Sequence, residues 1–415
     1  MAVNFAKGER MRILYSAFEC NPKRGSDAYV GWSWAKTMSK TDEIHVLTDV
    51  GNKEDIERFT KENPTNATFH FVDVPKIFSR FLVGRKGYFA RYYIWQWSAY
   101  RYAKSLSKEV LFDIIHHVSI ADFRVAGQLW RLRTPFVYGP VGGGQETPKA
   151  LMPYVMKYSK REKIRVLINR AAMLEPSYRK AMRRAAAIFV SNDETKAAIS
   201  CAVKRSQPLR QMCELGVDEQ YLKEKSSLYR QPEEKVHVLV SGRLMYRKGL
   251  ELLLDACLFI DTEMPYVVDV YGGGHEEDDV RAQIRERKLQ DKVILHGKVP
   301  YEQMSEVYQK SDVFALPSLR ETTGTAVVEA MANKLPVVAL KQNGVKYLVG
   351  DDAGILADIG TKEETIQNLA AALQMLIDNP TLRASLGARG HEKLKEYTWE
   401  AKAKQMKKLY CEIQN

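Results

Sequence analysis

Long apolar runs and regularly spaced cysteines are both lacking in this sequence. No stretch of about 18 consecutive apolar residues is available to span a bilayer. The first 18 residues, MAVNFAKGERMRILYSAF, lack the continuous apolar segment of a signal peptide. The five cysteines are scattered and have no metal-ligand spacing, which indicates reduced thiols and excludes a disulfide framework or a zinc site: Cys20, Cys201, Cys213, Cys257 and Cys411. We therefore expect a cytoplasmic protein.

Two motifs for bound diphosphates are also missing. No Asp-x-Asp triplet occurs, so the usual carboxylates for a metal-bound diphosphate are absent from the sequence. The segment Tyr271-Gly-Gly-Gly-His-Glu276 lacks the third glycine of the G-x-G-x-x-G dinucleotide fingerprint and has no acidic partner in the expected place. We expect neither a nicotinamide cofactor nor a metal ion.

The 415 residues are enough for two domains of roughly 200 residues each. Short apolar runs alternate with helical patterns, as in parallel sheets with helical crossovers. A break occurs at 214–218, and a polar stretch follows at 223–235. We predict strands at 12–18, 44–48, 68–72, 114–118, 135–138, 188–191, 236–241, 267–271, 293–296, 313–316 and 336–340, and helices at 31–39, 326–332 and 397–413. This α/β pattern predicts two Rossmann-like, doubly wound domains facing a cleft.

The second half contains cations and carboxylates after two of these strands. Gly242, Arg243 and Lys248 follow the strand at 236–241. Glu321 precedes the predicted helix at 326–332, and Glu329 lies within it. Because the first turn of a helix leaves backbone N–H groups unpaired, the region of Gly324 can face an anion. A carboxylate beside a phosphate suits sugar hydroxyls or developing positive charge, so the pattern predicts a cleft for a phosphorylated sugar.

These motifs resemble those of the retaining glycosyltransferases of family 4, which have the GT-B fold. The resemblance is carried by two glutamates with seven residues between them, Glu321 and Glu329, and by Gly242-Arg243 followed by Lys248-Gly249. It implies a nucleoside diphosphate sugar as donor. Arg243, Lys248 and the backbone at Gly324, Thr325 and Ala326 would stabilise the leaving diphosphate. Glu321 would hold the sugar and Glu329 the ribose.

Further features of the same resemblance lie in both halves. Gly25 and Ser26, in the loop FECNPKRGSDAYVGWSW, would approach the donor phosphates and sugar. His116 or His117 would lie near the reacting carbon, although either residue is equally compatible with a structural role. The glycine loop 142–144 is expected to line a site. Gly273 and the backbone of Lys298 would border the nucleobase.

The net charge of +12 is unevenly distributed. Residues 76–108 contain eight Lys or Arg, ten aromatic residues and no Asp or Glu. This composition suits the surface of an anionic membrane. It also suits single-stranded nucleic acid, or a helix that buries its aromatic rings while its cations reach water. The membrane reading is favoured and no nucleic acid is expected, so we expect peripheral binding at the inner face of the cell membrane.

Together with these observations, the resemblance implies a glycosyltransferase that moves a hexose-type sugar, with retention of configuration, to a glycan or lipid-linked acceptor. The domains expected are an acceptor-side domain at 1–214, a donor-binding domain at 215–395 and a C-terminal helix at 396–415 that returns to the first domain. Two other functions fit the same layout: a nucleotide-sugar 2-epimerase and a catalytically silent sugar-nucleotide-binding protein. The donor base, the sugar and the acceptor are not specified by these motifs.

Overall fold

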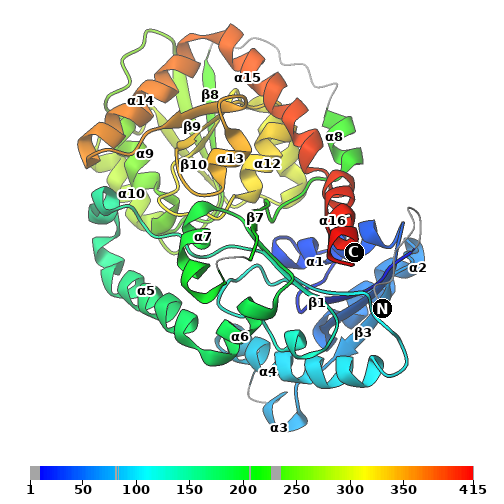
Figure 1. The fold of residues 1–415 in the computed structure, drawn as a ribbon. Helices are drawn as coiled ribbons and strands as arrows, with labels where there is room; N and C mark the ends of the chain where they lie inside the picture. Colours follow the sequence, from blue (N-terminus) through cyan, green and yellow to red (C-terminus); the bar gives the residue numbers. More distant parts are fainter. Residues whose placement is uncertain (1–9, 80–81, 83, 205–206, 226–234, 415) are drawn as a thin grey trace. The chain divides into compact units, whose positions relative to one another are not determined.

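A computed structural model describes residues 10–79, 82, 84–204, 207–225 and 235–414 (Figure 1). The chain forms two units. Unit 1 contains the chain up to Gly144, Val166–Gly216 and the part from Trp399 onward, and unit 2 contains Gln145–Arg165 and Val217–Thr398. The chain passes from unit 1 into the main part of unit 2 between Gly216 and Val217, inside the break at 214–218, and it returns to unit 1 at Trp399.

Unit 1 is built on a parallel sheet of seven strands in the order β3-β2-β1-β4-β5-β6-β7. The strands are β1 (Arg12–Ala17), β2 (Glu43–Asp49), β3 (Thr68–Val72), β4 (Ile114–Ser119), β5 (Phe136–Val141), β6 (Ala187–Val190) and β7 (Leu209–Gln211). Strands β1, β4, β5 and β6 are almost entirely buried, because helices cover both faces of a doubly wound sheet.

The helices of unit 1 include one from the C-terminal end of the chain. They are α1 (Asp27–Met38), α2 (Lys53–Glu62), α3 (Lys76–Ser79), α4 (Gly84–Leu106), the end of α5 (Ser159–Leu174), α6 (Pro176–Arg184), α7 (Asp193–Ile199) and α16 (Trp399–Gln414). Helix α16 packs beside α1 (Figure 1). Trp399 of α16 meets Trp34 of α1 edge to face, with ring centroids 5.7 Å apart, and both rings are buried.

Unit 2 is built on a parallel sheet of six strands in the order β10-β9-β8-β11-β12-β13. The strands are β8 (Val236–Ser241), β9 (Tyr266–Tyr271), β10 (Val293–Gly297), β11 (Val313–Leu316), β12 (Val337–Leu340) and β13 (Gly354–Ala357). The helices are α8 (Glu219–Lys225), α9 (Leu250–Cys257), α10 (Glu277–Glu286), α11 (Met304–Lys310), α12 (Thr325–Ala332), α13 (Val345–Val349), α14 (Lys362–Asp378) and α15 (Pro380–Lys393).

The two Rossmann-like sheets confirm the predicted fold class. Each predicted strand is present within a few residues of its expected bounds. Sequence reasoning missed β7 and β13: β7 has the sequence LRQ, with one apolar residue, and β13 is only four residues long. Helix α1 begins at Asp27 and not at residue 31, because part of the polar glycine loop is already helical.

The segment 145–165 packs with unit 2, although it lies before the boundary expected at residue 214. It contains the 3-10 helix η3 (Lys149–Tyr158) and the start of α5. Leu151, Tyr154 and Val155 of η3 join the core formed by β8, α9 and α14. The apolar face of η3 therefore decides where this segment folds, and this was not visible in the alternation of strands and helices.

Helix α4 divides the aromatic residues of 76–108 between a core face and an exposed face. Tyr92 and Trp95 are buried, whereas Phe89, Tyr93 and Trp97 are about half exposed, four residues apart. The side chains of Arg85 and Lys86 lie outside the described part of the structure. Arg91 is paired with Asp49 and Asp73. Among the described residues, no helix has the length and apolar character needed to cross a membrane.

The contact of α16 with α1 predicts a large stability effect in unit 1. Trp399→Ala should lower the free energy of unfolding by about 3–5 kcal/mol, because it removes a buried ring against Trp34 and leaves a cavity. Trp97→Ala is the matched control, and it should cost less than about 1 kcal/mol because Trp97 is 45% exposed. Chemical denaturation measures both, and equal losses would contradict the assignment of α16 to the core of unit 1.

Candidate functional site

The candidate site of unit 2 lies on two loops that leave neighbouring strands at the same edge of the sheet. Strand β8 leads into Gly242, Arg243, the 3-10 helix η5 (Tyr246–Lys248) and then α9. Strand β11 leads through Glu321 into α12. Because β8 and β11 pair in parallel, their carboxyl ends meet at one edge. The motifs that are separated by about 70 residues of sequence are thus brought together.

Lys248 and Glu321 contact each other directly across these loops. The Lys248 ammonium donates to Oε2 of Glu321, and the Arg247 guanidinium lies 3.4 Å from the same oxygen. Burial raises the pKa of Glu321, but the charges of Lys248 and Arg247 outweigh it, so the pKa is lowered overall. Glu321 is therefore an ionised acceptor of hydrogen bonds at neutral pH.

Glycines let the loops approach one another closely. Gly249 has a φ of 67°, and a Cβ there would lie 2.0 Å from the carbonyl oxygen of Pro317, which precedes Glu321 in the β11 loop. Gly324 caps α12 with a φ of 97°, so Thr325 and Ala326 form the first turn of that helix. The amide of Glu321 is held by Oδ1 of Asn343 at 3.0 Å. These contacts define the place of Glu321 relative to Lys248.

Glu329 lies further along α12 in a different environment. Its Oε1 accepts a hydrogen bond from Tyr301 at 2.9 Å, and its Oε2 accepts one from Tyr308 at 2.8 Å. Burial raises the pKa of Glu329, and the two phenol hydrogen bonds only partly offset this. The two glutamates of the motif therefore have pKa shifts of opposite direction.

The glycine loop after β9 packs against the loop after β8. The amide of Leu244 donates to the carbonyl of Gly273 at 3.1 Å, and the amide of Gly272 donates to Gly297 at 2.8 Å. Lys298 is exposed, and its Cβ lies 3.7 Å from where a Cβ on Gly273 would be. Gly273 and Lys298 thus adjoin one another, next to the loop that contains Leu244.

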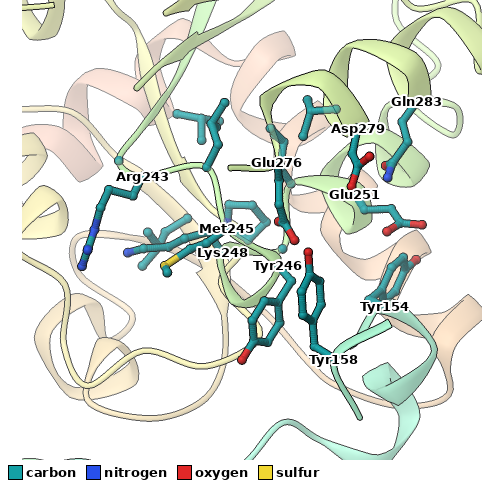
Figure 2. A pocket seen from close by; sticks show the side chains of 18 of the residues that line it. Tyr154, Tyr158, Arg243, Met245, Tyr246, Lys248, Glu251, Glu276, Asp279 and Gln283 are labelled. Atoms are coloured by element: carbon teal, nitrogen blue, oxygen red, sulfur yellow. The ribbon is translucent and has the colours of Figure 1, made fainter. Parts of the chain in front are cut away.

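A cavity in unit 2 shares part of this site (Figure 2). Gly242, Arg243 and Lys248 line it, whereas Glu321, Gly324 and Glu329 do not. In Figure 2 the side chains of Arg243 and Lys248 extend to one side, away from Tyr154 and Glu251. Other parts of the wall come from η3 and α10, which no motif indicated: Tyr154, Lys157, Tyr158, Asp279, Val280 and Gln283.

The candidates of unit 1 have varied surroundings. Gly25 and Ser26 are exposed in the loop before α1, and Ser26 has a φ of 59°. His116 is buried, with its ring nitrogens bonded to the Tyr410 hydroxyl and the Gly139 carbonyl. His117 is also buried, 3.3 Å from the Tyr92 hydroxyl. Burial lowers the pKa of His116 to about 3 and that of His117 to about 4, so both rings are neutral at pH 7.

Both histidines have hydrogen-bond partners within unit 1, and for His117 these are the Tyr92 hydroxyl and the backbone of Ile120. His116 has partners for both nitrogens within the core of unit 1, which is the arrangement of a structural histidine. In the glycine loop at 142–144, Gly144 approaches the backbone of α7 so closely that a Cβ would lie 2.6 Å from Cα of Thr195. Close packing against α7 is therefore a sufficient reason for a glycine at position 144.

Sequence reasoning missed several residues that surround Glu321. Of these, only Arg247 could have been found from the sequence, because it is a second cation directly beside Lys248. Arg320 and Glu162 pair at 2.8 Å, and the Tyr246 hydroxyl donates to Glu162, also at 2.8 Å. Glu162 is 158 residues away from Arg320, and no spacing rule connects them.

Comparison with known proteins finds a family match in the second half of the chain. Residues 223–393 match the family model described as glycosyl transferases group 1. This segment is therefore similar to that family. It contains both loops of the candidate site, so Lys248 and Glu321 lie inside the matched range.

Curated relatives match over a similar length. The D-inositol 3-phosphate glycosyltransferase of Kineococcus radiotolerans is 30% identical over 194 residues, which cover 43% of this chain and 45% of the relative. The sulfoquinovosyl transferase SQD2 of Arabidopsis thaliana is 28% identical over 172 residues, covering 40% and 32%. The match thus spans less than half of each relative.

Solved structures resemble the whole chain in fold. Sucrose-phosphate synthase from Thermosynechococcus elongatus has a TM-score of 0.64 at 19% identity, with 97% of this chain and 99% of that chain covered. Anabaena Alr3699/HepE in complex with UDP has a TM-score of 0.63 at 18% identity, with 96% and 99% covered. The two Rossmann-like units are those of the GT-B fold.

The opposite pKa shifts of the two glutamates predict opposite slopes of stability with pH. Glu321, with its lowered pKa, should add stability that is present above its unfolded pKa of about 4.3 and is lost as the pH falls through its folded pKa. Glu329, with its raised pKa, should stabilise most below its unfolded pKa and lose that contribution as the pH rises through its folded pKa.

Thermal unfolding of Glu321→Gln and Glu329→Gln between about pH 3.5 and pH 7 measures these slopes. The Tm deficit of Glu321→Gln relative to the parent chain should grow with pH, and that of Glu329→Gln should shrink. Parallel slopes in the two variants would contradict the environments described for the two carboxyl groups.

Proposed function

We propose that the chain is a glycosyltransferase of EC class 2.4 that transfers a hexose-type sugar from a nucleoside diphosphate sugar to an acceptor hydroxyl, with retention of configuration. The observation that carries the proposal is the contact of Lys248 with Glu321, which joins two motif loops within the family match. A polysaccharide, glycolipid or other glycoconjugate would be the product.

In this proposal the leaving diphosphate is stabilised by positive charge from the protein. Arg243 is exposed beside the glycine loops, and Lys248 is partly buried against Glu321. Cations and helix amides placed where charge develops lower the barrier to bond cleavage. Thr325 and Ala326 present the first-turn amides of α12. These groups would act in place of a metal ion, so we propose metal-independent transfer.

The glutamates would serve the sugar and the ribose. Glu321 is ionised and can accept hydrogen bonds from sugar hydroxyls when the Lys248 ammonium turns to the diphosphate. Glu329 would accept from ribose hydroxyls beside Tyr301 and Tyr308. The acceptor hydroxyl would lose its proton to the leaving diphosphate, on the face from which that group departs.

We also propose that α4 of unit 1 rests on an anionic membrane, which would suit a lipid-linked acceptor. Phe89, Tyr93 and Trp97 form a half-exposed row spaced by four residues, so they share one face of the helix. The same face continues with Arg101 and Lys104, both exposed. Aromatic rings with cations alongside suit the headgroup layer.

The proposed function is tested by donor hydrolysis without acceptor, after nucleoside diphosphates have been compared by thermal shift. HepE has been solved with UDP and with UDP-glucose, so these ligands come first, followed by GDP and ADP and their sugars. Arg243→Ala and Lys248→Ala should each lower kcat/KM by roughly a hundredfold, because each removes a charge that stabilises the diphosphate. Arg285→Ala, on the exposed face of α10, is the matched control.

Each other result has a definite meaning. Release of the C2 epimer of the sugar would identify an epimerase. Binding of a nucleoside diphosphate without turnover of any sugar would identify a silent binding protein. Unchanged kcat/KM in both variants would remove the donor site from these loops.

Sedimentation with vesicles tests the membrane proposal. The parent chain should bind phosphatidylserine vesicles at low salt and be released as salt rises, because surface attraction is screened within about 10 Å at 0.1 M. The triple variant Phe89→Ser, Tyr93→Ser, Trp97→Ser should lose most of this binding and keep donor hydrolysis. Phe259→Ser, which removes an equally exposed ring from unit 2, should bind like the parent. Absence of binding by the parent at low salt would end the proposal.

A further inference from the structure

Glu162 is a buried carboxylate outside every motif, and it touches both loops of the candidate site. It lies on the first turn of α5, in the segment 145–165 that packs with unit 2. Its side chain is 7% exposed. A buried charge is stable only with well-placed partners, so its contacts show what it does.

One oxygen of Glu162 receives a hydrogen bond from each loop. The Tyr246 hydroxyl, in the loop after β8, donates to Oε1 at 2.8 Å. The Arg320 guanidinium, in the loop after β11, donates to the same oxygen at 2.8 Å. Tyr246 stands two residues before Lys248, and Arg320 stands directly before Glu321. A single oxygen of Glu162 thus links one residue close to Lys248 with one residue close to Glu321.

The same segment makes a second contact with Glu321. The Gln145 amide lies 3.4 Å from the backbone carbonyl of Glu321, and the Arg165 guanidinium holds the carbonyl of Gln145. Arg165 also lies 3.7 Å from Oε2 of Glu162. Both ends of the segment 145–165 are therefore connected to the residue that would hold the sugar.

We infer that Glu162 is a positioning residue, which holds the two loops of the donor site in register through Tyr246 and Arg320. The inference rests on the proposed function for its kinetic consequences and on the contacts alone for its structural ones. Its role is to keep Lys248 and Glu321 at the separation that the donor requires. A misplacement of about 1 Å at a reacting group can cost a hundredfold in rate.

Glu162→Gln keeps the shape of the side chain and removes its charge. Amide hydrogen exchange should become faster in both loops, 242–249 and 317–324, at constant pH and temperature. With the donor that the parent chain hydrolyses, kcat should fall by roughly tenfold to a hundredfold, with a smaller change in KM. A merely structural role would lower Tm and leave both loops and kcat as they are.

Two further variants sharpen the experiment. Tyr246→Phe removes only the hydrogen bond from the first loop, so exchange should accelerate in 242–249 and remain unchanged in 317–324. If Glu162→Gln fails to fold, Tyr246→Phe alone still tests the link between Glu162 and the first loop. Asp312→Asn is the matched control: its carboxylate accepts from the amide of His237 at the opposite, amino-terminal edge of the same sheet. It should leave exchange in both loops unchanged.

The test of Glu162 can fail or succeed independently of the test of the proposed function. If no sugar nucleotide is turned over, the exchange experiment still decides whether Glu162 holds the loops together. Unchanged exchange of both loops in Glu162→Gln, or an equal acceleration in Asp312→Asn, would overturn the inference even in an active enzyme. A kcat of Glu162→Gln within about twofold of the parent would also overturn it.

Discussion

The ion pair between Lys248 and Glu321 is the contact on which the arrangement of unit 2 at its candidate site depends. Both groups are largely buried, and taking two charges out of water is favourable only with close partners. Arg247 and Asn343 supply such partners to Glu321, through its carboxylate and its amide. The pair forces the loops after β8 and β11 to lie side by side, and Gly249 permits this because its close approach to Pro317 leaves no space for a Cβ.

The fold and the motif loops could be predicted because their signals are local. Buried parallel strands appear as short apolar runs, and 236–241 and 313–316 coincide with β8 and β11. The start of α12 follows from a glycine before a helical pattern. In contrast, β7 could not be predicted because it has no apolar run. The exposure of Trp97 and the burial of Trp95 could not be predicted either, because they depend on which face of α4 meets the sheet.

The surroundings of the site could not be predicted, because they depend on contacts over long sequence distances. Tyr301 and Tyr308 reach Glu329 from η6 (Tyr301–Gln303) and α11, and nothing in their spacing from residue 329 is distinctive. The placement of 145–165 in unit 2 depends on whether a short apolar face finds a matching groove. For His116, both readings were open until Tyr410, 294 residues later, proved to be a partner.

The segment 145–165 completes unit 2 with contacts that the matched range lacks. The family match covers 223–393, yet Glu162 and Gln145, which contact Arg320 and Glu321, lie outside it. A buried arginine such as Arg320 needs a carboxylate, and without one it would be an uncompensated charge beside the site. The matched range is therefore not self-sufficient in this chain. The charge of Arg320, in the loop after β11, is balanced by Glu162 of α5, a helix that the chain forms before it enters the second sheet.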